Sequence, residues 1–131
     1  MTHLFDSNIC IGLLKGREPA LRAGLTALSP REVALCSVVK AELLYGARRS
    51  TRVDANLRRL ERFFLQFDSL PFDDNAAEWY GVLRAQLERS GNPLGNNDLM
   101  IASIALSTGA VLVTRDEEEF VRIPGLRLTT W

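Results

Sequence analysis

The segment Gly95–Asp116, GNNDLMIASIALSTGAVLVTRD, decides the fold of this chain. Its pattern predicts a loop, a helix with Asp98 in its first turn, and a short apolar strand at Val111–Val113. Asp98 shares a helical stripe with Ile101 and two alanines, so its carboxylate is expected at the edge of the buried face. Asp116 comes just after the strand. Two carboxylates should therefore converge at one end of a parallel sheet, the usual place for a site in an open α/β fold.

Short apolar strands alternate with amphipathic helices through the rest of the chain. Further strands are predicted at His3–Phe5, Val33–Cys36, Leu70–Phe72 and, at an edge, Leu126–Leu128. Helices are predicted at Ile9–Leu14, Pro19–Leu28, Val38–Arg48, Val53–Phe67, from Asp73 or Asp74 to Ser90, and at Glu117–Phe120. This alternation predicts an α/β sandwich with a central, mostly parallel sheet, and the chain length predicts one domain over residues 1–131.

Individual residues in these elements carry local expectations. Ser37 is expected to be the N-cap of its helix, Trp79 to point inward, and Gly46 to mark a close approach of another backbone. Core packing is the first explanation for the aromatic run Phe63-Phe64 with Phe67.

Two more acids stand out in the first third of the chain. Asp6 ends the first strand, and Glu42 lies on a helical stripe with apolar residues and Tyr45. Burying an unpaired carboxylate is costly or neutralises it. Glu42 therefore needs a partner such as a metal or another cation.

Each of these four acids also has an ordinary explanation as a turn, cap or surface residue. Together they are harder to explain, because two carboxylates ~4 Å apart repel by ~4 kcal/mol at an effective dielectric of 20. The lone His3 excludes a zinc cluster, and Cys10 and Cys36 lie in apolar runs, so they are expected to be buried and reduced. All-oxygen ligation suits Mg²⁺ or Mn²⁺. The chemistry implied is metal-assisted attack of water on a phosphoryl group.

The residue content excludes several other classes of protein. The formal net charge is zero, so no overall field draws the chain to nucleic acid or membrane. No segment approaches the ~20 apolar residues of a transmembrane helix, and the N-terminus lacks a signal-peptide pattern. We therefore expect a cytoplasmic protein without a membrane partner. Arginines do crowd one region, where Arg48, Arg49 and Arg52 lie close together.

Four motifs in this order resemble the PIN-domain ribonucleases, and most closely the VapC-type toxins of toxin–antitoxin pairs. They are Asp6-Ser7-Asn8, Ala41-Glu42-Leu43-Leu44-Tyr45-Gly46, Pro93–Ala102 and Leu112–Phe120. The resemblance covers essentially the whole chain and implies an α/β/α PIN fold. It also implies that the acids bind Mg²⁺ or Mn²⁺ and that the protein hydrolyses RNA.

The resemblance also implies a role for each site residue. The metal acids would be Asp6, Glu42 and Asp98, with Asp116 as a fourth and more variable acid; Asn8 would orient the first acid, and Ser37 and Thr114 would be nearby hydroxyls. Two positions depart from the family pattern. Ser7 replaces the more frequent threonine, and Arg115-Asp116 replaces a frequent pair of asparagines. Whether Asp116 contacts metal directly, through water or not at all stays open.

The family further implies a substrate and two protein partners. The substrate would be structured RNA such as tRNA or rRNA, cut where it is single-stranded or looped. Arg48, Arg49 and Arg52 are candidates for contacts with its backbone, or else form a solvated or dimer-facing surface. The protein would form a homodimer and be inhibited by a VapB-type antitoxin whose tail presents arginine to the acids. A groove for this antitoxin is the second explanation for the aromatic run.

Other functions fit the sequence less well. A phosphatase of the haloacid dehalogenase type requires a second aspartate two positions after the first, where this chain has Asn8. A receiver domain requires paired acids beside its phosphoacceptor, and this chain lacks such a pair. The alternative from another class is a PIN-like module that binds RNA or protein without cutting it, although the intact acids argue against this.

Overall fold

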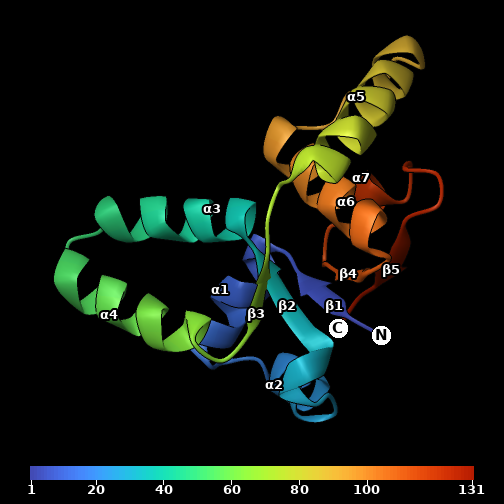
Figure 1. The fold of residues 1–131 in the computed structure, drawn as a ribbon. Helices are drawn as coiled ribbons and strands as arrows, with labels where there is room; N and C mark the ends of the chain where they lie inside the picture. The colour runs from blue at the N-terminus through green and yellow to red at the C-terminus, as the bar shows by residue number, and fades with distance from the viewer.

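A computed structural model describes all of residues 1–131 (Figure 1). The strands are β1 (His3–Phe5), β2 (Val33–Cys36), β3 (Asp68–Leu70), β4 (Val111–Val113) and β5 (Arg127–Thr129). The helices are α1 (Ser7–Lys15), α2 (Pro19–Thr26), α3 (Ser37–Arg48), α4 (Val53–Phe64), α5 (Asp74–Arg89), α6 (Asn96–Thr108) and α7 (Glu117–Phe120), with a 3-10 turn at Pro30–Glu32. The predicted order of strands and helices is confirmed; four elements have the predicted boundaries and the others differ by at most three residues at either end.

The five strands form one sheet in the order β3-β2-β1-β4-β5, and every pair is parallel. His3 pairs with Val33 on one side and with Val111 on the other. The sheet therefore grows outward from β1 in both directions, first through β2 and β3 and later through β4 and β5. Ligand sites in such sheets lie at the carboxyl ends of the strands where the order reverses, which here is between β1 and β4.

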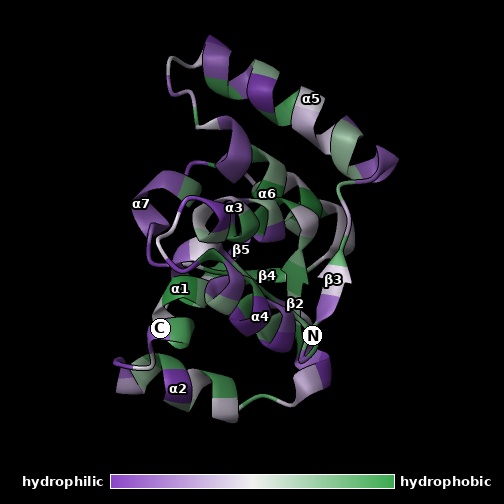
Figure 2. Cartoon of the chain, turned by 90° about the vertical axis from the view of Figure 1, so that its left-hand side faces the viewer, coloured by the Kyte–Doolittle hydropathy of each residue, from purple (hydrophilic) through white to green (hydrophobic).

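The inner strands are apolar because helices cover both faces of the sheet. All residues of β2 and β4 are buried, and most of them belong to a core of 26 buried hydrophobic residues. Figure 2 shows hydrophobic colour along β2, β4 and α6, while α2, α5 and α7 carry many hydrophilic residues. No helix combines the length and apolar character needed to cross a bilayer.

Two helical arms flank the carboxyl ends of the strands. Helices α3 and α4 pack side by side as one arm, and α5 packs on α6 as the other (Figure 1). The beginning of α3 lies near the beginning of α6, so residues in the first turns of these helices can meet.

The aromatic run forms part of the core, as predicted. Edge-to-face contacts connect Phe63 to Phe67 (5.1 Å between ring centroids), Phe67 to Phe5 (6.2 Å) and Phe5 to Trp131 (5.1 Å). Helix α4 ends at Phe64, not Phe67, and the turn after it brings the Phe67 ring back onto Phe63. Phe63 is the buried member of the adjacent pair, while Phe64 is half-buried beneath Lys40.

Three local predictions about helices and strands are wrong. Ser37 is the first residue of α3 and not its N-cap; its Oγ accepts a hydrogen bond from the amide of Phe72 (3.2 Å) instead. The third strand lies two residues earlier than Leu70–Phe72, because Asp68–Leu70 pairs with β2. Trp79 is 41% exposed, since α5 packs chiefly on one neighbouring helix and cannot cover so large a ring.

Glu42 does not lie on the buried stripe of its helix, contrary to prediction. The buried residues of α3 are Val39, Leu43 and Ala47, and Glu42 lies beside them. Gly46 is exposed, and no atom lies within 4 Å of the position a Cβ would take there, so the predicted close approach is absent.

Gly24 does occupy a tight position. A Cβ at Gly24 in α2 would lie 2.5–2.9 Å from ring atoms of Trp131. Gly24→Ala should therefore displace this ring and lower the free energy of unfolding by about 1–3 kcal/mol. The control is Gly81→Ala in α5, where no atom lies within 4 Å, and this change should stabilise by about 0.5–1 kcal/mol. Urea unfolding of both variants measures the difference, and equal effects would contradict the assigned packing of Trp131.

Candidate active site

The central strands β1 and β4 place Asp6, Thr114 and Asp116 at the point where the strand order reverses. The amide of Asp6 donates to the carbonyl of Val113 (3.2 Å), so the pairing of the two strands continues to the first acid. Asp6 is only 6% exposed and Thr114 is fully buried, whereas Asp116 is exposed. The strand ends thus meet at the predicted edge of the sheet.

Asp6 is fixed in position because it also caps α1. Its Oδ1 accepts a hydrogen bond from the amide of Ile9 (3.0 Å), which satisfies one of the free N–H groups of the helix. Asn8 is exposed and makes no bond to Asp6, so the orienting role predicted for Asn8 belongs to the Ile9 amide. Thr114 holds the loop after β4, since its Oγ1 accepts from the amide of Asp116 (2.9 Å).

Glu42 finds its partner in a residue to which the sequence assigned no role. The hydroxyl of Ser7 donates to Oε1 of Glu42 over 2.7 Å and thereby connects the first turn of α1 to α3. Ser7 directly follows the acid that ends β1, and this hydroxyl beside an acid is the only signal the sequence offered.

Asp98 lies half-buried in the first turn of α6, as predicted. Burial raises its pKa to about 6, and repulsion from Glu42, Asp116, Asp6 and Glu119 adds to this effect.

The pKa of Asp6 is also raised, chiefly by burial, with repulsion from Asp116 and Glu42 as smaller causes. The Thr114 hydroxyl and the Ile9 amide act in the opposite direction. The four predicted acids therefore lie near enough to influence one another. Glu119 is an additional acid in this field, one helical turn after Asp116.

The donor set fits a hard divalent cation. None of the three ion pairs in the chain involves Asp6, Glu42, Asp98 or Asp116. Arg115, beside the fourth acid, pairs with Glu18 instead. As the side chains stand, no three acidic, histidine or cysteine groups converge closely enough to enclose an ion. Carboxylate oxygens without nitrogen or sulfur donors nevertheless match Mg²⁺ or Mn²⁺, which keep several waters.

The other predicted site residues lie at varying distances from the acids. Ser37 lines a pocket together with Glu42. Arg48, Arg49 and Arg52 are exposed at the far end of α3 and in the turn that follows, and Arg48 and Arg49 lie roughly 10 Å along the helix from Glu42 at 1.5 Å per residue.

Both cysteines are free and buried, as predicted. Burial raises the pKa of Cys36 to about 11 and that of Cys10 as well, so neither is a nucleophile at neutral pH.

Comparisons with known proteins agree with this geometry. Residues 4–126 match the PIN domain family. Ribonuclease VapC2 of Rickettsia felis is 36% identical over 100% of this chain and 98% of its own length, and the tRNA(fMet)-specific endonuclease VapC of Shigella flexneri is 38% identical over 98% and 96%.

Two solved structures are also similar to the chain. They are VapBC2 of Rickettsia felis bound to a promoter DNA fragment (TM-score 0.94, 35% identity, 100% of this chain and 99% of that one) and DNA-bound VapBC of Salmonella typhimurium (TM-score 0.94, 37% identity, 100% and 98%). With its all-parallel sheet and the acids at the β1/β4 edge, the chain belongs to the PIN-domain family, in the group of VapC ribonucleases.

Proposed function

We propose that this protein is a metal-dependent endoribonuclease toxin that hydrolyses phosphodiester bonds of structured RNA. One observation carries the proposal: Asp6, Glu42 and Asp98 have no cationic partner, and burial of Asp98 together with repulsion from the other two raises its pKa to about 6. Carboxylates whose pKa is raised in this way are typical of functional sites. The relatives from Rickettsia felis and Shigella flexneri, a ribonuclease and a tRNA(fMet)-specific endonuclease, support the same chemistry.

Each acid has a distinct task in this proposal. Asp6 is held by the Ile9 amide at the end of β1, Ser7 directs Glu42, and Asp98 in the first turn of α6 lies close enough to both for their charges to raise its pKa. A bound Mg²⁺ or Mn²⁺ would stabilise the charge that develops on the phosphate and favour ionisation of the attacking water. Asp116 stands farther out and would contact the ion directly or through water.

Single-stranded or looped RNA is the proposed substrate, because a duplex hides its base edges in a deep and narrow groove. The tRNA(fMet) specificity of the Shigella flexneri relative favours a tRNA. A PIN-like module that binds RNA without cutting it is the second candidate, and the absence of cleavage by active protein would favour it.

The hydrogen bond from Ser7 should matter for metal affinity. Ser7→Ala removes the hydroxyl that directs Glu42, and losing such an outer contact typically costs 10- to 100-fold in metal affinity or activity. We expect the Mn²⁺ concentration for half-maximal cleavage to rise by about 10-fold. Ser7→Thr keeps the hydroxyl and should stay near wild type. If the alanine and threonine variants needed the same Mn²⁺ concentration, the Ser7 hydroxyl would have no role in metal binding.

The arm formed by α3 and α4 is proposed to bind the RNA backbone. Between Lys40 and Phe67 basic side chains outnumber acids seven to three, and Arg48, Arg49 and Arg52 form no ion pair. Replacing these three by glutamine should weaken RNA binding and lower the slope of log K against log salt by about 2, since each neutralised phosphate contributes ~0.7 for single strands. An unchanged slope would favour a solvated or dimer-facing role.

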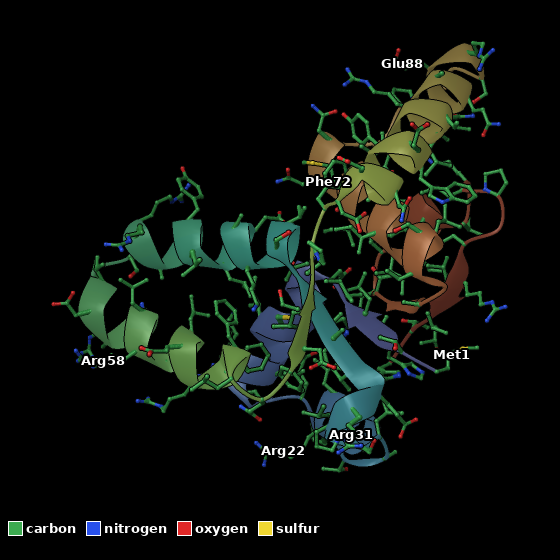
Figure 3. All side chains as sticks on the ribbon, in the orientation of Figure 1. Met1, Arg22, Arg31, Arg58, Phe72 and Glu88 are labelled. Carbon is green, nitrogen blue, oxygen red and sulfur yellow. The ribbon has the colours of Figure 1, made fainter.

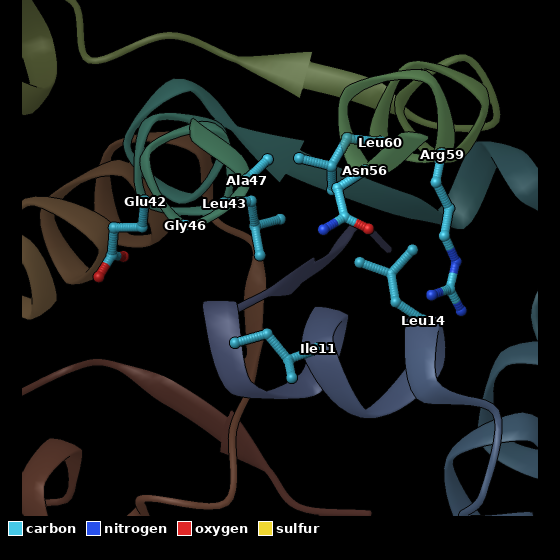
Figure 4. Close-up of a pocket in the computed structure, with 9 residues that line it drawn as sticks. All are labelled: Ile11, Leu14, Glu42, Leu43, Gly46, Ala47, Asn56, Arg59 and Leu60. Carbon is cyan, nitrogen blue, oxygen red and sulfur yellow. The ribbon is translucent and has the colours of Figure 1, made fainter. Parts of the chain in front are cut away.

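A groove between α1, α3 and α4 is the proposed seat of a VapB-type antitoxin (Figure 4). Its volume is about 220 Å³, and its lining includes Ile11, Leu14 and Leu60. Glu42 lies at one end and Arg59 at the other. An apolar segment of the antitoxin would fill the groove, and an arginine next to it would reach Glu42 and the neighbouring acids. The VapBC complexes of similar fold support such a partner.

The family resemblance implies a homodimer, and we propose that this chain forms one. Trp79 and Val82 on α5 are exposed large hydrophobic residues that line one pocket, and they offer a surface for a second copy. Light scattering of the purified chain measures this directly.

The decisive experiment is cleavage of total RNA by purified protein with Mn²⁺ and with excess EDTA. The protein should first be denatured, separated from any bound partner and refolded. Discrete cuts that EDTA abolishes would support the proposal and, once mapped, give the substrate. RNA that stays intact in Mn²⁺ but binds the refolded protein in EDTA would favour the binding module.

A further inference from the structure

A second pocket lies beside the acids, between the first turns of α3 and α6. Its volume is about 590 Å³, which is in the range of small-molecule sites. Seven residues line it: Ser37, Val38, Ala41, Glu42, Tyr45, Asn97 and Met100. We propose that this pocket binds one unpaired nucleobase next to the scissile phosphate and thereby sets where the RNA is cut. The inference rests on the proposed ribonuclease function and assigns the site a recognition element.

The position of the pocket is the first argument. Glu42 is shared between the pocket and the acidic site. Asn97 directly precedes Asp98 in the first turn of α6. A phosphate held at the acids would therefore place the base of an adjoining nucleotide within reach of the pocket.

The lining matches the faces of a base. Val38, Ala41 and Met100 form an apolar floor, and the Tyr45 ring is 63% exposed. An exposed aromatic ring beside apolar side chains offers a flat surface for stacking. Bases in single strands stack on such rings, which accept any base because every base has an apolar face.

The rim offers the hydrogen-bonding groups that a base edge needs. Asn97 is exposed, and its amide can both donate and accept. The Ser37 oxygen accepts from the amide of Phe72, which leaves the hydroxyl proton to donate. Figure 3 places Phe72 beside the start of α3, at the mouth between the two helical arms. The combination of a stacking ring and polar edges is how proteins distinguish one unpaired base from another.

Arg49 braces the stacking ring. Its guanidinium lies 5.4 Å from the centre of the Tyr45 ring, and Nη1 approaches the phenol oxygen at 3.5 Å. This contact limits rotation of the ring and places a positive charge where the next phosphate of a stacked nucleotide would lie. The pocket thus continues from the acids toward the basic end of α3.

The experiment compares one RNA oligonucleotide containing the mapped cut with copies that carry an abasic nucleotide on either side of it. With wild type, one abasic copy should be cut about 10- to 100-fold more slowly, through KM. Tyr45→Ala should cut the normal RNA more slowly by the same factor. It should cut the abasic copy as fast as it cuts the normal RNA. Tyr45→Phe keeps the ring and should recover most of the cleavage that Tyr45→Ala loses, and Asn97→Ala should change the preferred base. Leu44→Ala, an exposed neighbour outside the pocket, is the control.

The same oligonucleotides are also titrated by fluorescence anisotropy onto the Asp6→Asn variant with and without Tyr45→Ala. This binding measurement separates the two proposals: normal cleavage together with binding that ignores the abasic position would refute the pocket and leave the nuclease in place. If wild type cuts no RNA, the titration uses single-stranded oligonucleotides with one abasic position each, and base-dependent binding would then support the pocket while refuting the nuclease. The pocket proposal is overturned if Tyr45→Ala and wild type treat normal and abasic RNA alike. It is also overturned if light scattering shows that Tyr45→Ala breaks a dimer, because the ring would then be covered by a second copy.

Discussion

Asp6→Asn is expected to reduce metal-dependent RNA cleavage by at least about 10²–10³-fold, as losses of a central electrostatic group do, while the protein stays folded. Asparagine is as good an N-cap as aspartate, so the bond from the Ile9 amide to this side chain can be kept. What is lost is the negative charge at the buried strand end. Cleavage of the mapped RNA at several Mn²⁺ concentrations measures the effect.

The chain contains a matched control for this variant. Asp73 caps α5 as Asp6 caps α1, accepting from the amide of Ala76 over the same 3.0 Å. Asp73→Asn should leave cleavage unchanged, because Asp73 is exposed and is not among the acids that shift Asp6 or Asp98. If both variants lost activity together, the defect would lie in helix capping and the assignment of Asp6 would fail.

Asp98→Asn is expected to abolish cleavage and, at neutral pH without metal, to stabilise the protein. The folded-state pKa of Asp98 is raised from 3.8 to about 6, so its ionised form opposes folding. Each unit corresponds to ~1.4 kcal/mol. Asp98 is partly exposed and solvent screens part of this effect, so we expect a gain of about 1 kcal/mol.

The contribution of Asp98 to the free energy of unfolding depends on pH. Below pH 3.8 both folded and unfolded states hold the proton, and the contribution of Asp98 is absent. Between pH 3.8 and about 6 the folded state holds more protons, so wild-type stability falls as pH rises, and the penalty is constant above pH 6. The variant should therefore gain stability at pH 7.5 but not at pH 3.5.

Urea unfolding at these two pH values in EDTA tests the prediction. Asp74→Asn serves as control, since Asp74 is an acid in the first turn of α5 outside the site, and it should lose a few tenths of a kcal/mol through the helix dipole. Mn²⁺ should raise the midpoint for wild type and not for Asp98→Asn. A destabilised Asp98→Asn at pH 7.5 would mean that repulsion at the site is weak.

The sequence placed Asp6 and Asp98 correctly within their elements, because these two positions depend on local structure. A strand end fixes Asp6, and a helix start fixes Asp98, so their meeting follows once the strands are parallel. The hydrogen-bond partner of Glu42 could not be predicted, because Ser7 is 35 residues away and meets Glu42 only when α1 and α3 pack together. Trp79 shows the same limit: helical spacing gives its face, but only the tertiary packing of α5 gives its exposure.

Hydrogen bonds donated by backbone amides could not be predicted from the sequence pattern either. The family resemblance implied an orienting role for Asn8, whereas the group that bonds Asp6 is the Ile9 amide. Ser37 was predicted to be a helix cap because serine is common there, but its hydroxyl accepts a hydrogen bond from the amide of Phe72, just after the neighbouring strand β3. In both cases a contact made possible by folding replaced a local preference.

The packing of α5 has a consequence for the lifetime of the protein. Because α5 packs chiefly on α6 and projects beyond the sheet, it can detach as a unit at a lower free energy than the central strands. Its amides should exchange with deuterium well before those of β1 and β4. A protease that captures the detached helix would then act at a rate set by this opening equilibrium, so turnover of the protein would be controlled by α5 and not by global unfolding.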